Sequence, residues 1–417
     1  MRGTRRRRGF VLVQSLIIIA GLVALMALLA ANQRAALQES QDLLRRRRAE
    51  VAARSALARA LAVLQDADPN VVTLEDDWAV LGAGGTEEFD LGDATFRLQI
   101  LDAGSLMNVN SASEEQLRLL PVEPELIDGL LDWREAGLQP RPDGAKDEYY
   151  NELDQPYNAR LGPLTTVSEL LLVKGWTARA LFSPPTDIAT TAPLPEDADG
   201  DPLPLAALLT VDSGAPNTRA GGEARVNLGQ AGLSPGALAQ QLGLNPLLAV
   251  QIVARAPYTS FGALLSLPGL SPQDSQQILD AVTFTGGNRI EGKINLNTAT
   301  EAVLQTLPNV TPDVAAEIVS RQGAGGFASL GELATLPGLS GALLPTVADA
   351  ATVGSDTWIV RAYGQSGGVG VAIEAVVGLR QDRIEVQTWD RQGSPEIPAW
   401  WNWDEEPSAT VEAGAGL

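Results

Sequence analysis

The sequence predicts an α+β protein in which a long N-terminal helix packs on a small antiparallel sheet, and a large all-α insertion separates the strands of that sheet. Three observations support this prediction. A helical pattern runs from about residue 11 to residue 65. Alternation typical of strands occurs before residue 105 and again after residue 350. Three helical stretches that resemble one another lie between these two strand regions.

The composition narrows the possible functions. The chain contains no cysteine and no histidine, which excludes disulfides, thiol catalysis and the commonest general base. Its net charge is −21, and a body this acidic repels the phosphates of nucleic acids. The sequence carries no nucleophile elbow, phosphate-binding loop or cofactor fingerprint. We therefore expect that the protein is not an enzyme and that nucleic acid is not its main ligand.

The chain opens with a basic leader and an apolar segment. Arg5–Arg8 precede Gly9 and Phe10, and the following 21 residues, 11–31, carry no charge. This is the length of a helix that spans a bilayer, and it exceeds the roughly 7–15 residues of a cleavable secretory segment. Because the arginines precede the span, the N-terminus is predicted to be cytoplasmic and the remainder exported. A second basic run, Arg45–Arg48, opposes this orientation but lies farther from the span.

The helical pattern continues beyond the apolar segment. Residues 32–65 are rich in Ala, Leu, Arg, Gln and Glu, which favour helix, and Asp68-Pro69-Asn70 ends the pattern. Phe96, Leu98 and Ile100 alternate with polar residues, which predicts a strand. A three-stranded meander is predicted over 358–363, 371–379 and 384–389. We expect both strand regions to share one sheet, packed on the second half of the long helix.

The three similar stretches open with "LMNVN", "RVNLG" and "KINLN" and continue as a helix, a turn with proline, and a helix ending in arginine. Ser111 or Ser113 is suited to cap the first helix of the first stretch, and Thr298 or Thr300 that of the third. The stretches resemble helix-hairpin-helix or SAM-like repeats, some of which grip DNA through glycine-rich turns. Here the turns contain Pro124, Pro246 and Pro312, and proline has no N–H to offer to a phosphate. A scaffold role is therefore favoured over DNA binding.

These patterns predict the following boundaries: leader 1–9; transmembrane and amphipathic helix 10–65; strands 66–105; first SAM-like helical domain 106–186; linker 187–222; second SAM-like or helix-hairpin-helix domain 223–345; C-terminal strands 350–392; and disordered tail 393–417, which holds Trp400, Trp401 and Trp403.

The leader, the Gly9–Phe10 junction and the amphipathic helix together resemble type IV pilin-like proteins, and the segment "LLDWREAGLQPRPDGAKDEYYNELDQPYNARLGPLTTVSELLLVKG" resembles the minor pseudopilin K family of type II secretion. The resemblance implies that a prepilin peptidase cleaves after Gly9 and methylates Phe10. Most members carry a glutamate where this chain has Gln14, and the neutral amide implies a place at the pseudopilus tip. The implied partners are other minor pseudopilins, and the implied location is the inner membrane, with the bulk of the chain periplasmic.

Five carboxylates crowd into 12 residues around Gly144: Asp143, Asp147, Glu148, Glu152 and Asp154. Such oxygen-only clusters suit calcium, although a solvated acidic loop fits the same pattern. The family resemblance implies calcium binding in this region. A second, weaker candidate contains Glu196, Asp197, Asp199 and Asp201, but it lacks a glutamate at the twelfth position of the loop.

Two alternatives stay open. One is a membrane-anchored DNA-binding protein with helix-hairpin-helix repeats. The other is a plain periplasmic scaffold with an uncleaved signal-anchor. The state of the mature N-terminus separates the second alternative from a pseudopilin.

Overall fold

The computed structural model describes the chain except for residues 1–5, 186–194, 197–199, 392–395, 404–408 and 413–417. The side chains of residues 6–11 and 409–412 are also outside the description.

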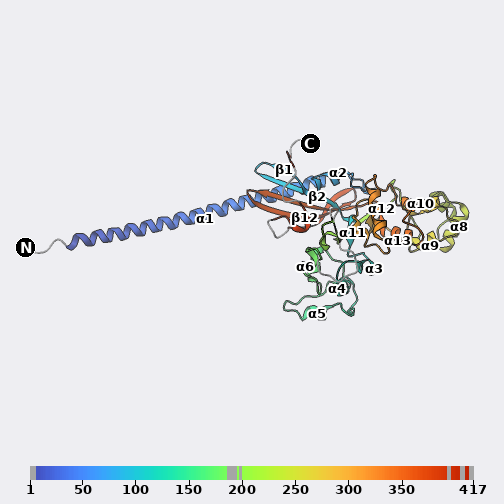
Figure 1. Ribbon diagram of the computed structural model, residues 1–417, viewed down its shortest axis with the longest axis horizontal. Coiled ribbons are helices and arrows are strands. Elements are labelled where there is room, and N and C mark those ends of the chain that lie inside the picture. Colours follow the sequence, from blue (N-terminus) through green and yellow to red (C-terminus); the bar gives the residue numbers. More distant parts are fainter. Residues whose placement is uncertain (1–5, 186–194, 197–199, 392–395, 404–408, 413–417) are drawn as a thin grey trace, which may run out of the picture.

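Helix α1 (Arg6–Leu64) is 59 residues long and projects from one end of the molecule (Figure 1). At about 1.5 Å per residue it spans roughly 90 Å. Residues 12–48 are all exposed, whereas the last part of the helix buries one face. That face consists of small residues at helical spacing, with one leucine at its end: Ala49, Ala52, Ala53, Ala56, Ala60 and Leu64. The predicted helix, about 11–65, is confirmed.

The alanine face lets α1 approach the sheet closely. An added Cβ at Gly364, in the middle of the sheet, would lie 2.1 Å from the carbonyl oxygen of Ala49 and 2.5 Å from the nitrogen of Ala53. Only glycine fits at such a distance. The sheet contributes apolar residues from both strand regions to this interface, including the large Phe96, Leu98 and Trp358.

The sheet has six strands in the order β13-β12-β11-β2-β1-β14. Their bounds are β1 Glu87–Leu91, β2 Ala94–Asp102, β11 Thr357–Ser366, β12 Val369–Arg380, β13 Arg383–Arg391 and β14 Ala409–Glu412. Neighbouring strands are antiparallel, except that β14 runs parallel to β1. Strands β2 and β11 pair from Trp358 opposite Asp102 to Gln365 opposite Thr95. The expectation of one shared sheet packed on the second half of the helix is confirmed.

Residues 103–356 form the insertion between β2 and β11, and we call this part the head. Figure 1 shows α4, α5 and α6 on one side of the head, and α8, α9 and α10 at the end far from the N-terminus. Most helices begin at a proline or after a capping side chain. The helices are α3 Glu114–Leu117, α4 Pro124–Arg134, α5 Asp147–Asn151, α6 Ala178–Phe182, α7 Pro235–Leu242, α8 Pro246–Arg255, α9 Phe261–Leu265, α10 Pro272–Ala281, α11 Glu301–Leu304, α12 Pro312–Gln322 and α13 Leu343–Ala350. Of the two candidate caps predicted for each helix, Ser113 and Thr300 are the ones that accept hydrogen bonds from the backbone of α3 and α11.

The head contains three units, and each is opened and closed by a pair of two-residue parallel strands. The pairs are β3 Met107–Asn108 with β4 Leu209–Thr210, β6 Val226–Asn227 with β7 Val282–Thr283, and β9 Ile294–Asn295 with β10 Ala351–Thr352. In each unit the asparagine side chain accepts the backbone N–H two residues further on. In each closing strand a hydrophobic residue is followed by a threonine. One continuous apolar core joins the three units.

Two predicted boundaries are wrong. The described part of the predicted linker 187–222 packs into the head, because Leu205, Leu208 and Leu209 are buried and β4 closes the first unit. The prolines and acidic residues of this stretch masked its apolar run. The predicted disordered tail is ordered over 396–403, where Trp401 and Trp403 are buried against the sheet.

Candidate functional site: the membrane helix and the junctions with the head

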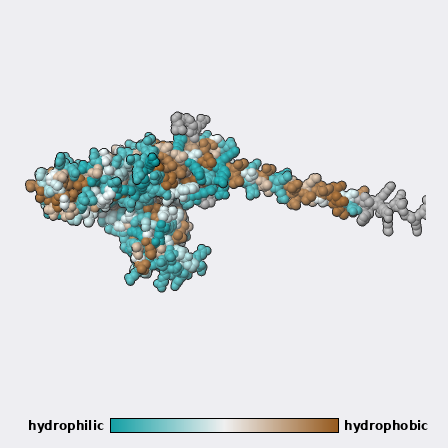
Figure 2. Space-filling view, turned by 180° about the vertical axis from the view of Figure 1, so that it is seen from behind, coloured by the Kyte–Doolittle hydropathy of each residue, from teal (hydrophilic) through white to brown (hydrophobic). Residues whose placement is uncertain are grey.

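The first half of α1 is long and apolar enough to cross a membrane, by length and composition. Figure 2 shows this part as a hydrophobic surface on a bare rod. Its large side chains, such as Leu12, Ile17 and Met26, are about 65–70% exposed. Exposing so many large apolar side chains to water is unfavourable. This half of α1 therefore requires lipid or protein around it.

The predicted processing residues lie at the start of this helix. The backbone of Gly9 and Phe10 is helical, and Gln14 follows one turn later with an exposed side chain. Residues 1–5, which include the first arginine of the Arg5–Arg8 run, lie outside the described part of the chain. Cleavage after Gly9 and the role of Gln14 stay predictions.

Asp102, the last residue of β2, forms the first junction between sheet and head. One carboxylate oxygen accepts the backbone N–H of Gly104 at 2.7 Å. The other accepts the amide of Asn295 at 2.8 Å and the hydroxyl of Thr298 at 2.6 Å. Burial raises the pKa of Asp102, while hydrogen bonds from Ser355 and these neighbours oppose the rise. The end of β2 is thereby fastened to the opening of the third unit.

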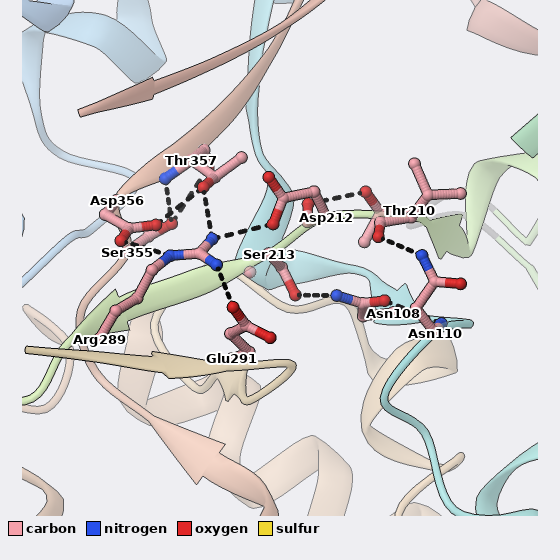
Figure 3. Close-up of polar contacts among 12 residues, drawn as sticks. Asn108, Asn110, Thr210, Asp212, Ser213, Arg289, Glu291, Ser355, Asp356 and Thr357 are labelled. Carbon is pink, nitrogen blue, oxygen red and sulfur yellow. Dashed lines mark hydrogen bonds and ion pairs between the residues drawn. The ribbon is translucent and has the colours of Figure 1, made fainter. Parts of the chain in front are cut away.

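Arg289, on β8 (Arg289–Glu291), forms the second junction (Figure 3). Its Nε donates to Asp356 at 2.8 Å, and one of its terminal nitrogens donates to Asp212 at 2.9 Å and to the hydroxyl of Thr357 at 3.1 Å. Burial alone would lower the pKa of Arg289, but the hydrogen bonds and charges of the two aspartates raise it above its ordinary value.

The surroundings of Arg289 are shaped to receive it. Gly214 on β5 (Gly214–Pro216) has no side chain where the guanidinium lies, since an added Cβ would be 2.4 Å from Arg289 Cζ. Arg380, from β12, adds a second cation at 3.3 Å from Asp356. Figure 3 also shows Asn108 of β3 bonded to Ser213, at 3.3 Å, beside this network. Through Arg289, the start of β11 is thus fastened to β8 and to Asp212 of the head.

The C-terminal segment 396–403 covers the face of the sheet opposite to α1. Trp403 donates its indole N–H to Gln99 at 3.0 Å and lies under the guanidinium of Arg97 at 5.2 Å. Trp400 lies under the guanidinium of Arg361 at 4.6 Å and contacts the ring of Phe182 on α6 at 5.8 Å. The segment therefore touches both the sheet and the first unit of the head.

Beneath this segment lies a buried ion pair. Arg361 of β11 donates to Glu374 of β12 at 3.1 Å. Burial raises the pKa of Glu374 and lowers that of Arg361. The tryptophans cover a polar face of the sheet. Because they pack there, segment 396–403 is not a loose tail.

The predicted calcium ligands are only partly brought together. Asp147, Glu148 and Glu152 line one open pocket of about 350 Å³, which Asp143 and Asp154 do not line. Asp147 accepts the backbone N–H of Ala159 at 2.8 Å. Within the described residues, no group of three or more carboxylates is close enough to hold a metal ion. As placed, these side chains do not form a ligand set.

Calcium binding at these residues stays a prediction. In the second candidate loop, Asp197 and Asp199 lie outside the described residues.

Sequence reasoning did not find Asp102, Arg289 or Asp356. Each is a single charged residue at a strand end, and none belongs to a motif. The one available signal was position, because Asp102 and Asp356 mark the points where the chain leaves and re-enters the sheet.

Two family models, both described as type II secretion system protein K, match residues 107–182 and 294–354. These ranges fall in the first and third units of the head. The type II secretion system protein K of Klebsiella pneumoniae is 29% identical over 197 residues, which is 42% of this chain and 59% of that relative. The match therefore spans less than two thirds of the relative's length.

Among solved structures, one chain of the GspK-GspI-GspJ complex from the type 2 secretion system of enterotoxigenic Escherichia coli is similar to this chain, with a TM-score of 0.46 and 14% identity. The similarity covers 87% of this chain and 100% of the chain in that complex.

Proposed function

Because the chain belongs to the type II secretion system protein K family, we propose that it is a minor pseudopilin at the tip of the pseudopilus, where it nucleates assembly for the export of folded proteins. In this proposal α1 crosses the inner membrane once, with a cytoplasmic N-terminus and a periplasmic head. Prepilin peptidase cleaves after Gly9 and methylates Phe10, and other minor pseudopilins are the partners. The family is one of structural secretion components and not of enzymes.

The position of the head is the observation that carries the tip assignment. It is inserted between two adjacent strands, β2 and β11, of the sheet that packs on α1. Asp102 and Arg289 fasten it to this sheet. A subunit repeated along a shaft needs room for copies above and below it. A head of three units held at this place favours a position at the end of the filament, because every further copy stacked along the shaft would have to make room for the head.

Gln14 supports the same assignment. In a pilin-type filament, a carboxylate at this position pairs with the N-terminal amine of a neighbouring subunit, and the amide of Gln14 has no charge for this pair. A tip subunit has no subunit above it that needs the carboxylate.

We further propose that the helical hairpins act as a scaffold, as SAM-like repeats do, and not as a DNA grip. Helices α4, α8 and α12 each begin at a proline, so the turns before them lack one backbone N–H that could face a phosphate. A band retarded by this protein with duplex DNA at moderate salt would contradict the scaffold role.

The tip assignment is tested by gold-labelling the head on pseudopili assembled in cells that produce the whole system. The proposal predicts label at one end of each fibre, and loss of cargo secretion in a strain that lacks the chain. Label along the shaft, or normal assembly and secretion without the chain, contradicts the proposal. Normal secretion without the chain favours the plain periplasmic scaffold.

A further inference from the structure

The region that holds the predicted calcium ligands also contains a buried cation of the chain itself. Lys146 lies directly before α5 and is 7% exposed. Its ammonium group donates to the backbone carbonyl oxygen of Asp132, and to that of Glu135 at 2.9 Å. A carboxylate oxygen of Asp132 lies 4.0 Å away. A charge withdrawn from water needs such partners, and these oxygens supply them.

The carbonyl groups that Lys146 contacts belong to the end of α4. This helix ends at Arg134 and is followed by Glu135 as its C-terminal cap. The last carbonyl groups of a helix have no partner within it, and they carry the negative end of the helix dipole, which favours a cation. Because Lys146 stands at the other end of the loop 135–146, its ammonium joins the two ends of that loop.

A second lysine holds the middle of the same loop. Lys174 donates to the carbonyl oxygen of Asp143 at 3.2 Å and to that of Gly144 at 3.1 Å. Its ammonium lies over the ring of Tyr149, 5.3 Å from the ring centre. Gly144 in turn lies close to Asp132, since an added Cβ would be 1.8 Å from the carboxylate. Two of the three lysines of the chain therefore hold this one loop.

Arg141, within the loop, neutralises the buried carboxylate of Asp132, which is 1% exposed. The backbone N–H of Arg141 donates to this carboxylate at 2.9 Å, and its guanidinium donates to it at 3.1 Å. The same guanidinium donates to the carboxylate of Glu135 at 2.9 Å. The buried acid of the loop is thus paired with a cation of the same loop.

This arrangement differs from a calcium site in what the oxygens contact. Calcium binds through carboxylate and backbone carbonyl oxygens. Here four backbone carbonyl oxygens accept hydrogen bonds from the two lysines, and the carboxylate of Asp132 accepts from Arg141. The predicted ligands Asp147, Glu148 and Glu152 lie outside this set and line the open pocket. The oxygens that could enclose a cation within the loop already contact cations of the chain.

We propose that the ammonium of Lys146 takes the place of a metal ion in the first unit of the head, so that loop 135–146 is folded without calcium. A bound ion stabilises a fold only in proportion to its concentration, whereas a tethered ammonium is always present. Calcium held by Asp147 and its neighbours in the open pocket would add to this arrangement and is not needed for it. The inference does not depend on the proposed function.

The wild-type, full-length chain in detergent provides the first test. An amine-reactive ester labels lysines, and mass spectrometry follows Lys146 in excess calcium and in excess chelator. In both media Lys146 is expected to react at least about tenfold more slowly than in the denatured chain, because its ammonium is buried in a folded loop. A chelator that raises the rate at Lys146 to that of the denatured chain overturns the proposal.

Hydrogen exchange of the loop amides tests the role of the ammonium. Lys146→Gln removes the charge that closes α4, so exchange over 135–146 is expected to rise about tenfold. Arg179→Gln is the matched control, because Arg179 is exposed on α6 of the same unit, and it should change this exchange less than about twofold. Equal exchange in the two variants overturns the proposal. Exchange of β11 reports whether each variant is folded, and if Lys146→Gln unfolds, the wild-type comparison decides alone.

Lys146→Glu tests whether this position is that of a cation. In chelator, the variant is expected to exchange at least as fast as Lys146→Gln, because its carboxylate is placed among carbonyl oxygens without a cation. Excess calcium should bring the exchange of the loop to within about threefold of wild type, since it supplies a cation to these oxygen ligands. Arg179→Glu makes the same change of charge at the surface, and its loop should respond to neither medium. A folded Lys146→Glu variant whose loop calcium does not protect contradicts the replacement of a metal by the ammonium.

Discussion

The two halves of α1 differ in what covers them. The second half, from Ala49, presents alanines to a sheet that comes close enough to require Gly364. The first half, residues 12–48, presents leucines, isoleucines and valines that no other described part of the chain covers. One half is therefore completed by its own fold, while the other requires lipid or protein around it. We expect substitutions of buried residues in the head and the sheet to lower the free energy of unfolding. Substitutions in the uncovered half of α1 are expected to change it little.

The largest effect is expected at the C-terminal segment. Trp401→Ala removes a buried ring that closes the sheet face over Arg361, and it should lower the free energy of unfolding by about 3–5 kcal/mol. Chemical denaturation of the fragment beginning at Asn32 measures this. Trp389→Ala is the matched control, because Trp389 is 52% exposed, and its cost should stay below about 1 kcal/mol. Equal costs would show that the tail is not part of the fold.

Close packing between α1 and the sheet is tested next. Gly364→Ala forces a Cβ against the backbone of α1 and should cost about 2–3 kcal/mol. Gly137→Ala is the control, since no atom lies within 4 Å of an added Cβ there. If Gly364→Ala is as mild as Gly137→Ala, the contact between helix and sheet is looser than described.

The Asp102 junction predicts a pH-dependent effect. Asp102→Asn turns an amide N–H toward a backbone or side-chain donor and should cost about 2 kcal/mol at pH 7. Burial raises the pKa of Asp102 in the folded state, so the folded state binds the proton of this carboxyl more tightly than the unfolded state does. The resulting gain in the free energy of unfolding is fully present below the unfolded pKa of about 4 and is lost as the pH rises through the folded pKa. The difference between wild type and variant should therefore widen from pH 7 to pH 5. A difference that narrows on acidification contradicts the assignment.

Calcium gives a smaller expected effect. If the loop around Asp147 binds calcium, the ion stabilises the folded state by mass action, and the melting temperature of the metal-stripped fragment should rise by about 2–4 °C per kcal/mol of binding. Asp147→Asn combined with Glu148→Gln should abolish the rise. A wild-type fragment that responds neither to calcium nor to a chelator removes the site.

The smallest effect is expected in the uncovered half of α1. Leu44→Ala removes an exposed side chain and should change the stability of the same fragment by less than about 0.5 kcal/mol. A larger loss would mean that the fold does cover this half, and that the contrast between the two halves is wrong.

Sequence patterns were sufficient for features that depend on local periodicity. The helix, the meander and the repeated hydrophobic-Asn openings were predicted because each is a regular spacing of apolar residues or a capping motif. Pairing of β2 with β11 was expected only as a shared sheet, since its register depends on strands that are separated by the entire head.

Features that depend on tertiary partners were missed. The tail was predicted to be disordered because its proline and acidic content hid the role of Trp401, which packs against Arg361 on β11 and Ala372 on β12. The linker prediction failed in the same way, because Leu205 and Leu209 have a partner only after the first unit closes. Arg289 and Asp356 have no local pattern, so only the fold brings them together.

The central claim is that α1 is a processed assembly helix and not a permanent anchor. Mass spectrometry of the N-terminus, on full-length protein from membranes of cells that possess the prepilin peptidase, tests it most directly. The claim predicts a chain that begins with N-methylated Phe10. A chain that still carries Met1 and the arginine leader would contradict it.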